Sequence, residues 1–331
     1  MTFKYNKVYL KETSTVAGPY EKKGPIKKYF DKTYSDLYFK TSSWEKAEIK
    51  LVQTSLEILL KKINKKSTDI DLVIGGDLLN QITATSYGVL NTGNSFLGIY
   101  NACATSVEGL IIASSLIDAK KISNAIVTTS SHNMSSEKQF RNPTEYGAPR
   151  PKNATFTSTG SASAYLTKEK TNIKVESSTI GKIIDFNQND PNNMGKVMAP
   201  AAIDTIKRHL DDLKRTPDYY DLIVTGDLGV YGKEIVIDYM LTMHDIDLRK
   251  NYNDTGVMLY NQEEQEYTLA GGSGPACCPL VAYSYILDQL RNKKLKKVLI
   301  VATGALFSPT MIYQKQNIPS IAHAISLEVV E

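Results

Sequence analysis

Asp71-Leu-Val-Ile-Gly-Gly-Asp77-Leu and, 150 residues further on, Asp221-Leu-Ile-Val-Thr-Gly-Asp227-Leu are two versions of one pattern. Each is a short apolar run that ends in Gly-Asp and follows a lysine-rich helical segment. Continuous apolar runs of this length, bounded by turn residues, are typical of strands that are buried on both faces of an α/β protein. The two stretches therefore predict matching strands in two related halves of the chain.

The similarity continues downstream of both strands. In the first half a small-residue turn, a helix and a strand follow in order, at 101–106, about 107–119 and 124–130. In the second half the same three elements recur in the same order, at 271–276, about 280–291 and 297–304. Chance similarity between two α/β segments does not reproduce so many elements in one order, so we infer an internal duplication.

This duplication predicts the domain organisation. Each half ends on a strand, 160–166 or 321–327, and no linker rich in Pro, Gly or Ser separates the halves. We expect an N-terminal half, 1–170, and a C-terminal half, 171–331, that pack as one body. The stretch 132–158 has little periodicity, and a long irregular excursion inside a compact protein is often functional. We expect it to cover a pocket, with an ordinary exposed loop as the alternative.

Composition argues against several classes of protein. The 331 residues are 42% hydrophobic and 22% charged, which is typical of a globular chain. The 39 basic and 35 acidic residues nearly balance, so we expect no nucleic-acid partner. No apolar run approaches the roughly 18 residues that span a bilayer, and the first residues carry no signal-peptide core. Three cysteines do not make a disulfide framework, so we expect a reducing, cytosolic setting.

Cys103 is the first candidate for chemistry, because it lies where a strand ends and a helix begins. The N-terminus of a helix offers free N–H groups and the positive end of a dipole, which lower the pKa of a thiol and favour a thiolate nucleophile. The same electrostatics would hold a carboxylate ligand at the amides of Ala104 and Thr105. The alternative is a small buried cysteine that fills a tight junction.

A nucleophilic cysteine needs a partner, usually a histidine. Of the four histidines, only His132 follows a strand end that should lie near Cys103, and we expect it in the pocket. Asp77 and Asp227 end equivalent strands, where α/β proteins usually build their sites. For either carboxylate the alternative is a helix N-cap.

The chain resembles the thiolase fold in its duplicated halves, in the cysteine that opens the central helix, and in the segments 159–164 and 304–310. This resemblance implies five layers, α-β-α-β-α, as in thiolases, ketoacyl synthases and chalcone synthases, with Cys103 at the position of the nucleophile. The usual partners are missing. The pair Gly226-Asp227 stands where the first catalytic His is expected, and 271–274 stands where synthases of the cysteine–histidine–asparagine type have the Asn. The departures argue against acyl-transfer chemistry.

Six longer strings resemble one family more closely, that of stage V sporulation protein AD from endospore-forming bacteria. They lie at 30–34, 76–81, 130–133, 139–147, 198–207 and 301–312, and the resemblance runs from about residue 15 to 328. The family is not known as an enzyme. It belongs to the machinery that moves dipicolinic acid (pyridine-2,6-dicarboxylate), largely as its calcium chelate, into the developing spore and out at germination. The resemblance implies dipicolinate binding in the inherited pocket and a peripheral place at the spore inner membrane, beside other proteins of the same operon.

A flat dianion needs compact hydrogen-bond donors and positive potential. Arg141 or Arg150 would supply a bidentate guanidinium, although each is equally suited to a surface ion pair. Phe140 or Tyr146 would stack on the pyridine ring, with a core role as the alternative. Calcium is expected only as a companion of the ligand. The expected ligand-binding residues are Asp77, Cys103, Ala104, Thr105, Ser131, His132, Arg141, Arg150 and Asp227, with no catalytic residue, no metal ligand and no cofactor.

Two other functions stay open. One is an active acyltransferase that acylates Cys103 and uses His132 in an unconventional way. The other is a structural subunit whose pocket is vestigial. Homodimerisation is common among proteins of this fold, and the sequence permits it.

Overall fold

The computed structural model describes residues 1–141 and 149–331, and their strands form one 12-stranded mixed sheet beside a separate two-stranded ribbon. The large sheet consists of two half-sheets. The strands of the first half-sheet are β2 (Tyr9–Ala17), β3 (Lys32–Thr33), β4 (Val73–Gly76), β5 (Phe96–Gly98), β6 (Asn124–Ser131) and β8 (Gly160–Thr167). The strands of the second are β1 (Thr2–Lys4), β9 (Ile173–Thr179), β10 (Leu222–Thr225), β11 (Tyr252–Asp254), β13 (Lys297–Ala305) and β14 (Ser320–Val329). The ribbon pairs β7 (Phe156–Thr157) with β12 (Gly272–Ser273).

Helices follow the same duplicated order. Those of the first half are α1 (Trp44–Ile63), α2 (Thr83–Val89), α3 (Thr105–Asp118) and α4 (Asn133–Phe140). Those of the second half are α5 (Met194–Leu213), α6 (Gly229–His244), α7 (Thr255–Leu259), α8 (Cys277–Val281), α9 (Leu287–Arg291) and α10 (Pro309–Tyr313), with a π-helical turn at Ala282–Ile286 between α8 and α9. Short 3-10 turns lie at Glu21–Lys23, Lys27–Tyr29, Ser67–Asp69, Asn80–Ile82, Leu90–Thr92, Pro217–Tyr219 and Glu266–Thr268.

The pairing pattern repeats between the half-sheets. In the first, β4 is parallel to β5 and β6, and β6 is antiparallel to β8. In the second, β10 is parallel to β11 and β13, and β13 is antiparallel to β14. The half-sheets join where Tyr9 of β2 pairs with Lys174 of β9. The duplication inferred from the sequence is therefore visible in the topology.

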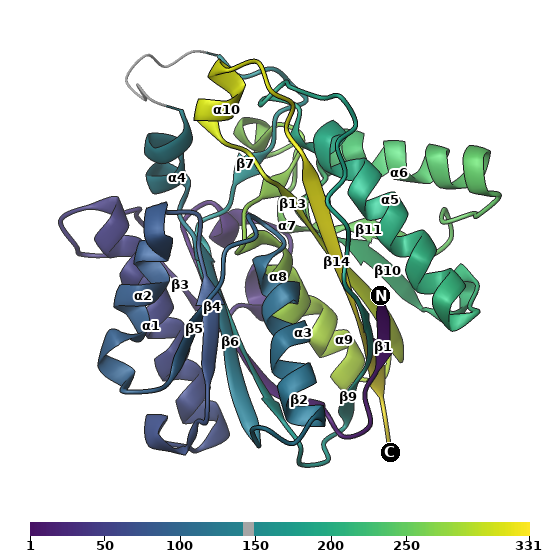
Figure 1. The fold of residues 1–331 in the computed structure, drawn as a ribbon. Coiled ribbons are helices and arrows are strands. Elements are labelled where there is room, and N and C mark those ends of the chain that lie inside the picture. The colour runs from purple at the N-terminus through teal and green to yellow at the C-terminus, as the bar shows by residue number, and fades with distance from the viewer. Residues whose placement is uncertain (142–148) are drawn as a thin grey trace.

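Five layers result from this arrangement (Figure 1). The helices α1 and α2 cover the outer face of the first half-sheet, and α5 and α6 cover the outer face of the second. Between the half-sheets lie α3 and the α8–α9 helix, which contact strands of both. Because α3 is covered on both sides, its residues are apolar or small nearly all round, whereas α5 buries one face on β13 and β14. The expected α-β-α-β-α fold is confirmed.

Two details differ from the expectation. The first residues do not stay within the first half, because β1 pairs with β9 of the second half-sheet. The excursion at 132–158 is not irregular throughout, since α4 forms within it and its N-terminus is capped by the His132 ring, which accepts from the amide of Met134. The division of the chain near residue 170 stays a prediction. No helix in the described ranges is long and apolar enough to cross a membrane.

Candidate functional site

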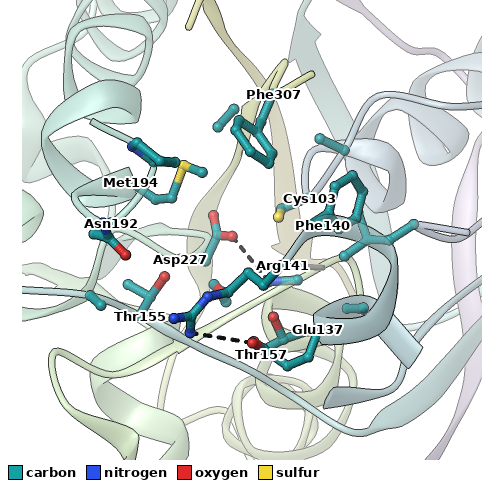
Figure 2. Close-up of a pocket in the computed structure, with 18 of the residues that line it drawn as sticks. Cys103, Glu137, Phe140, Arg141, Thr155, Thr157, Asn192, Met194, Asp227 and Phe307 are labelled. Carbon is teal, nitrogen blue, oxygen red and sulfur yellow. Dashed lines mark hydrogen bonds and ion pairs between the residues drawn. The ribbon is translucent and has the colours of Figure 1, made fainter. Parts of the chain in front are cut away.

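A cavity of about 250 Å³ lies at the carboxyl ends of β4 and β10, and residues of both halves line it (Figure 2). The first half contributes the turn at 102–103, one face of α4 and the segment 154–157. The second half contributes 191–198, the strand end at Asp227, and the stretch 305–313. Its volume is just below the roughly 300–1,000 Å³ of pockets for drug-sized ligands, which suits a small molecule.

Cys103 lies at the bottom of this cavity, on the turn that opens α3. Ala102 has a φ of 47°, in the left-handed region that allows the chain to turn sharply before the helix. Thr105 holds this turn from behind, because its Oγ1 donates to the Ala102 carbonyl at 2.7 Å and accepts from the Asn101 amide at 3.0 Å. Thr105 and Ala104 are buried behind the cavity wall, so their side chains do not face a ligand.

The carboxyl group of Asp227 lies on the cavity wall with Cys103 and acts on the charge of its thiol, and Asp227 stands where the resemblance to synthases predicts a histidine. Burial and this negative neighbour raise the pKa of the Cys103 thiol well above its ordinary value. The expectation of an activated thiolate is therefore wrong, since the dipole of α3 is outweighed by desolvation and by the adjacent carboxylate.

Asp227 is itself fully buried and strongly perturbed. Its Oδ1 accepts from the hydroxyl of Thr303 at 2.6 Å, and its Oδ2 accepts from the amide of Gly274 at 3.2 Å. Burial raises the pKa of the Asp227 carboxyl to about 7, although the bonds from Cys103 and Thr303 oppose the shift. The site thus holds a carboxyl group that changes charge near neutral pH.

Asp77, which ends the equivalent strand of the first half, does not line the cavity. Its Oδ1 accepts from the amide of Leu79 at 2.8 Å, and its Oδ2 accepts from the amide and hydroxyl of Thr85 at 2.7 and 2.8 Å. Only its neighbour Leu78 reaches the cavity wall. Asp77 therefore organises the turn before α2, and its expected contact with a ligand is corrected.

His132 was expected in the pocket, but it does not line the cavity. It is fully buried, its Nε2 bonds to the Leu37 carbonyl at 2.8 Å, and its ring packs on Phe39. Burial lowers the pKa of the His132 imidazole to about 4. The adjacent Ser131 is buried as well and donates to the Ser158 carbonyl at 2.7 Å. The side chains of Ser131 and His132 are structural because β6 ends inside the protein rather than at the cavity.

None of the four histidines, all of which lie in the described part of the chain, lines the cavity. His209 is buried between Thr179 and Tyr220. His323 is buried and contacts the Asn101 side chain at 2.7 Å through Nε2. No group of three or more potential metal-ligating side chains gathers among the described residues.

Both predicted arginines do line the cavity. Arg141 follows the end of α4, and its Nη1 lies 3.3 Å from Oε2 of Glu137, one helical turn earlier. Arg150 approaches the same carboxylate, with its Nη2 on Glu137 Oε1, and its Nη1 donates to the Thr155 carbonyl at 3.2 Å. Sequence reasoning missed Glu137, although its spacing of four residues from Arg141 on a helix is a usual signal for an ion pair.

Aromatic and aliphatic side chains form much of the remaining wall. Phe140 of α4 and Phe307 of the second half meet with ring centroids 5.8 Å apart. In the view of Figure 2, Phe307 lies on one side of Cys103 and Asp227, while Glu137 and Arg141 lie on the other. Met194 and Met198 at the start of α5, Ile312 and Tyr313 also line the cavity, and none of them was among the expected ligand-binding residues. Tyr146, considered as a stacking residue, lies outside the described residues.

Comparison with solved structures agrees with this architecture. The 3-oxoacyl-(acyl carrier protein) synthase III of Xanthomonas oryzae superposes with a TM-score of 0.61 at 11% identity, covering 99% of this chain and all of that one. Cerulenin-bound OleA of Xanthomonas campestris gives a TM-score of 0.60 at 14% identity, covering 99% and 98%. The chain therefore has a thiolase-like fold.

The family follows from the sequence as a whole. The chain belongs to the family described as Stage V sporulation protein AD (SpoVAD), whose profile matches residues 1–328. The Stage V sporulation protein AD of Bacillus subtilis is 45% identical over 321 residues, which cover 97% of this chain and 94% of that protein.

Proposed function

We propose that the cavity at Cys103 binds dipicolinate, and that the protein thereby takes part in the uptake of this compound into the developing spore and its release at germination. The observation that carries the proposal is the pair of guanidinium groups, Arg141 and Arg150, on the wall of a small cavity with aromatic rings. Guanidinium groups recognise carboxylates through paired N–H donors, and a pyridine ring that packs against Phe140 and Phe307 would contact apolar surface.

The surroundings of Cys103 support binding rather than acyl transfer. An acyl transferase needs a base that helps to form the thiolate and donors that stabilise an oxyanion. Here burial and the neighbouring carboxylate of Asp227 raise the pKa of the Cys103 thiol, and the Gly274 amide donates to the same carboxylate. We therefore include in the proposal that the cavity has no catalytic role.

The family extends the proposal beyond the cavity. It adds a peripheral place at the spore inner membrane, assembly with other proteins of the same operon, and homodimerisation. Calcium would arrive chelated by the ligand, and Asp227 is a buried carboxyl group on the cavity wall that could contact it. Co-purification from sporulating cells and light scattering of the purified protein test the partners and the oligomeric state.

The direct test is calorimetric titration of the purified protein with dipicolinate, with and without calcium. Arg141→Gln and Arg150→Gln should each weaken binding by about tenfold or more, because each removes one charge-assisted contact with a carboxylate. Arg249→Gln is the matched control, since Arg249 is exposed and pairs only with Asp247 in its own loop among the described contacts. Absence of saturable heat with the unmodified protein would exclude the proposed ligand, and equal affinity in all variants would exclude the proposed cavity.

A further inference from the structure

Glu137 occupies an unusual position in the cavity, because one carboxylate serves two arginines. Its Oε2 is 3.3 Å from Arg141 and its Oε1 contacts Arg150, so each oxygen is engaged by a different guanidinium. The Glu137 side chain is only 16% exposed, and that of Arg150 is 19% exposed. All three residues line the cavity.

This arrangement resembles the contacts that a bound carboxylate would make. A carboxylate ligand would approach the same guanidinium donors from the cavity, and two anions cannot share them in a partly buried site without strong repulsion. The Glu137 carboxylate is tethered to α4, whose first turn is fixed by the Ser135 hydroxyl on the buried Glu48 at 2.6 Å. It can therefore swing away from the arginines by side-chain rotation while the helix stays in place.

We propose that Glu137 is a built-in competitor of the ligand, holding Arg141 and Arg150 when no anion is bound and leaving them when a ligand carboxylate arrives. The inference rests on the proposed function, and it defines how the same site is regulated. The competition lowers the affinity for carboxylates and speeds their release, because a departing ligand is replaced at once by Glu137. It also keeps the two cations paired in the partly buried cavity, where unpaired charges are costly. A protein that must both accept and give up a dianion benefits from such a device.

The competition has a second consequence for the choice of ligand. A dicarboxylate contacts both arginines and displaces both contacts of Glu137, whereas a monocarboxylate displaces one. Removing the negative charge of Glu137 should thus strengthen the binding of dipicolinate more than that of picolinate (pyridine-2-carboxylate), which has a single carboxylate on the same ring.

The experiment compares Glu137→Gln with the unmodified protein in titrations with dipicolinate and picolinate, and in stopped-flow measurements of dipicolinate release. Loss of one charge contact of this kind corresponds to about a tenfold change, so Glu137→Gln should bind dipicolinate about tenfold more tightly, mainly through slower release. Glu45→Gln is the matched control. Glu45 of α1 forms an ion pair at 2.6 Å with Lys138, which lies on α4 like Glu137, but Glu45 does not line the cavity. Glu137→Asp, which keeps the charge on a shorter side chain, should give an intermediate affinity and guards against a folding defect in the Gln variant.

The outcomes separate this inference from the proposed function. If the unmodified protein binds dipicolinate and Glu137→Gln binds it equally or more weakly, Glu137 only positions the arginines and the inference is overturned. If Glu45→Gln tightens binding as much as Glu137→Gln, the effect comes from the stability of α4, and the inference is again overturned. If no form of the protein binds dipicolinate, the proposed function fails, and the competitor role fails with it.

Discussion

Asp77 and Asp227 end equivalent strands of the two half-sheets, yet only Asp227 faces the cavity. The difference arises from which residue caps the following turn. In the second half Asp254 of the neighbouring strand β11 accepts from the amides of Leu228 and Gly229. In the first half Asp77 accepts from the turn and helix that follow it. The capping carboxylate thus comes from different strands, and Asp227 is left available for Cys103.

The first prediction concerns the structural role of Asp77. In Asp77→Asn one carboxylate oxygen becomes an NH₂ group, which cannot accept from the amide of Thr85. A buried unsatisfied donor costs about 1–3 kcal/mol, so thermal or denaturant unfolding should show a loss of this size. The folded variant should still bind dipicolinate with unchanged affinity. A loss of binding in a variant that keeps full stability would return Asp77 to the ligand site.

A second prediction concerns the reactivity of Cys103. Because burial and, after it, the carboxylate of Asp227 raise the pKa of the thiol, alkylation by iodoacetamide should be slow at neutral pH. Asp227→Asn removes the negative charge, so the pKa should fall and labelling should accelerate several-fold. Peptide mass spectrometry separates Cys103 from Cys277 and Cys278, which are buried and serve as internal controls. Rapid labelling of the unmodified protein at neutral pH would contradict the assigned electrostatics.

The sequence predicts the fold far better than it predicts the site. Runs such as 71–77 and 221–227 carry the periodicity of buried strands, and duplication leaves a strong pattern that survives local irregularity. The helix predicted from about residue 107 corresponds to α3, which begins two residues earlier, at Thr105. The sequence at the end of a strand does not predict where the last side chain points, because that direction depends on the φ and ψ angles of the residues that follow the strand.

Positive φ angles at Gln81 and Ile82 illustrate the difficulty. They fold the chain back after β4 and bring Thr85 onto Asp77, and nothing in the residue types at 81 and 82 indicates left-handed backbone. The position of His132 could not be predicted for a related reason. Its ring caps α4 by accepting from the amide of Met134, and it does not reach the cavity. Glu137 and Phe307 come from α4 and from a loop of the other half, and only the packing of the two halves brings such residues together.

A third prediction is that dipicolinate binding weakens as the pH rises through about 7. The Asp227 carboxyl has a pKa near 7, so it is neutral below this pH and negative above it. Ordinary carboxyl groups have pKa values of about 4, so the ligand stays a dianion throughout this range. Ionisation of Asp227 therefore adds repulsion, and binding below pH 7 should be tighter. Titrations at about pH 6, 7 and 8 test this, and Asp227→Asn should remove most of the dependence. A flat profile in the unmodified protein would contradict it.

The last prediction concerns Glu48, a fully buried residue of α1 whose oxygens accept from Ser130 and Ser135. Burial, and to a smaller extent the nearby charge of Asp77, raise the pKa of its carboxyl to about 8. In the unfolded chain the pKa is near 4.5, so between about pH 5 and 8 the folded state binds this proton and the unfolded chain does not, and above the folded pKa both states release it. The free energy of unfolding must then decrease as the pH rises toward 8, and the stability is fully present only at lower pH.

The buried histidines do not contribute to the pH dependence above pH 7.5. The pKa values of His132, His209 and His323 are about 4 in the folded state and about 6.5 in the unfolded chain, so these side chains are neutral in both states there. Glu48→Gln mimics the protonated carboxyl, because its amide can still bond to the serine hydroxyls. The variant should be more stable than the unmodified protein at about pH 9 and should show a flatter stability profile between pH 7 and 9. Urea unfolding at these two pH values measures both effects. Parallel profiles for the two proteins would contradict the assignment of this proton to Glu48.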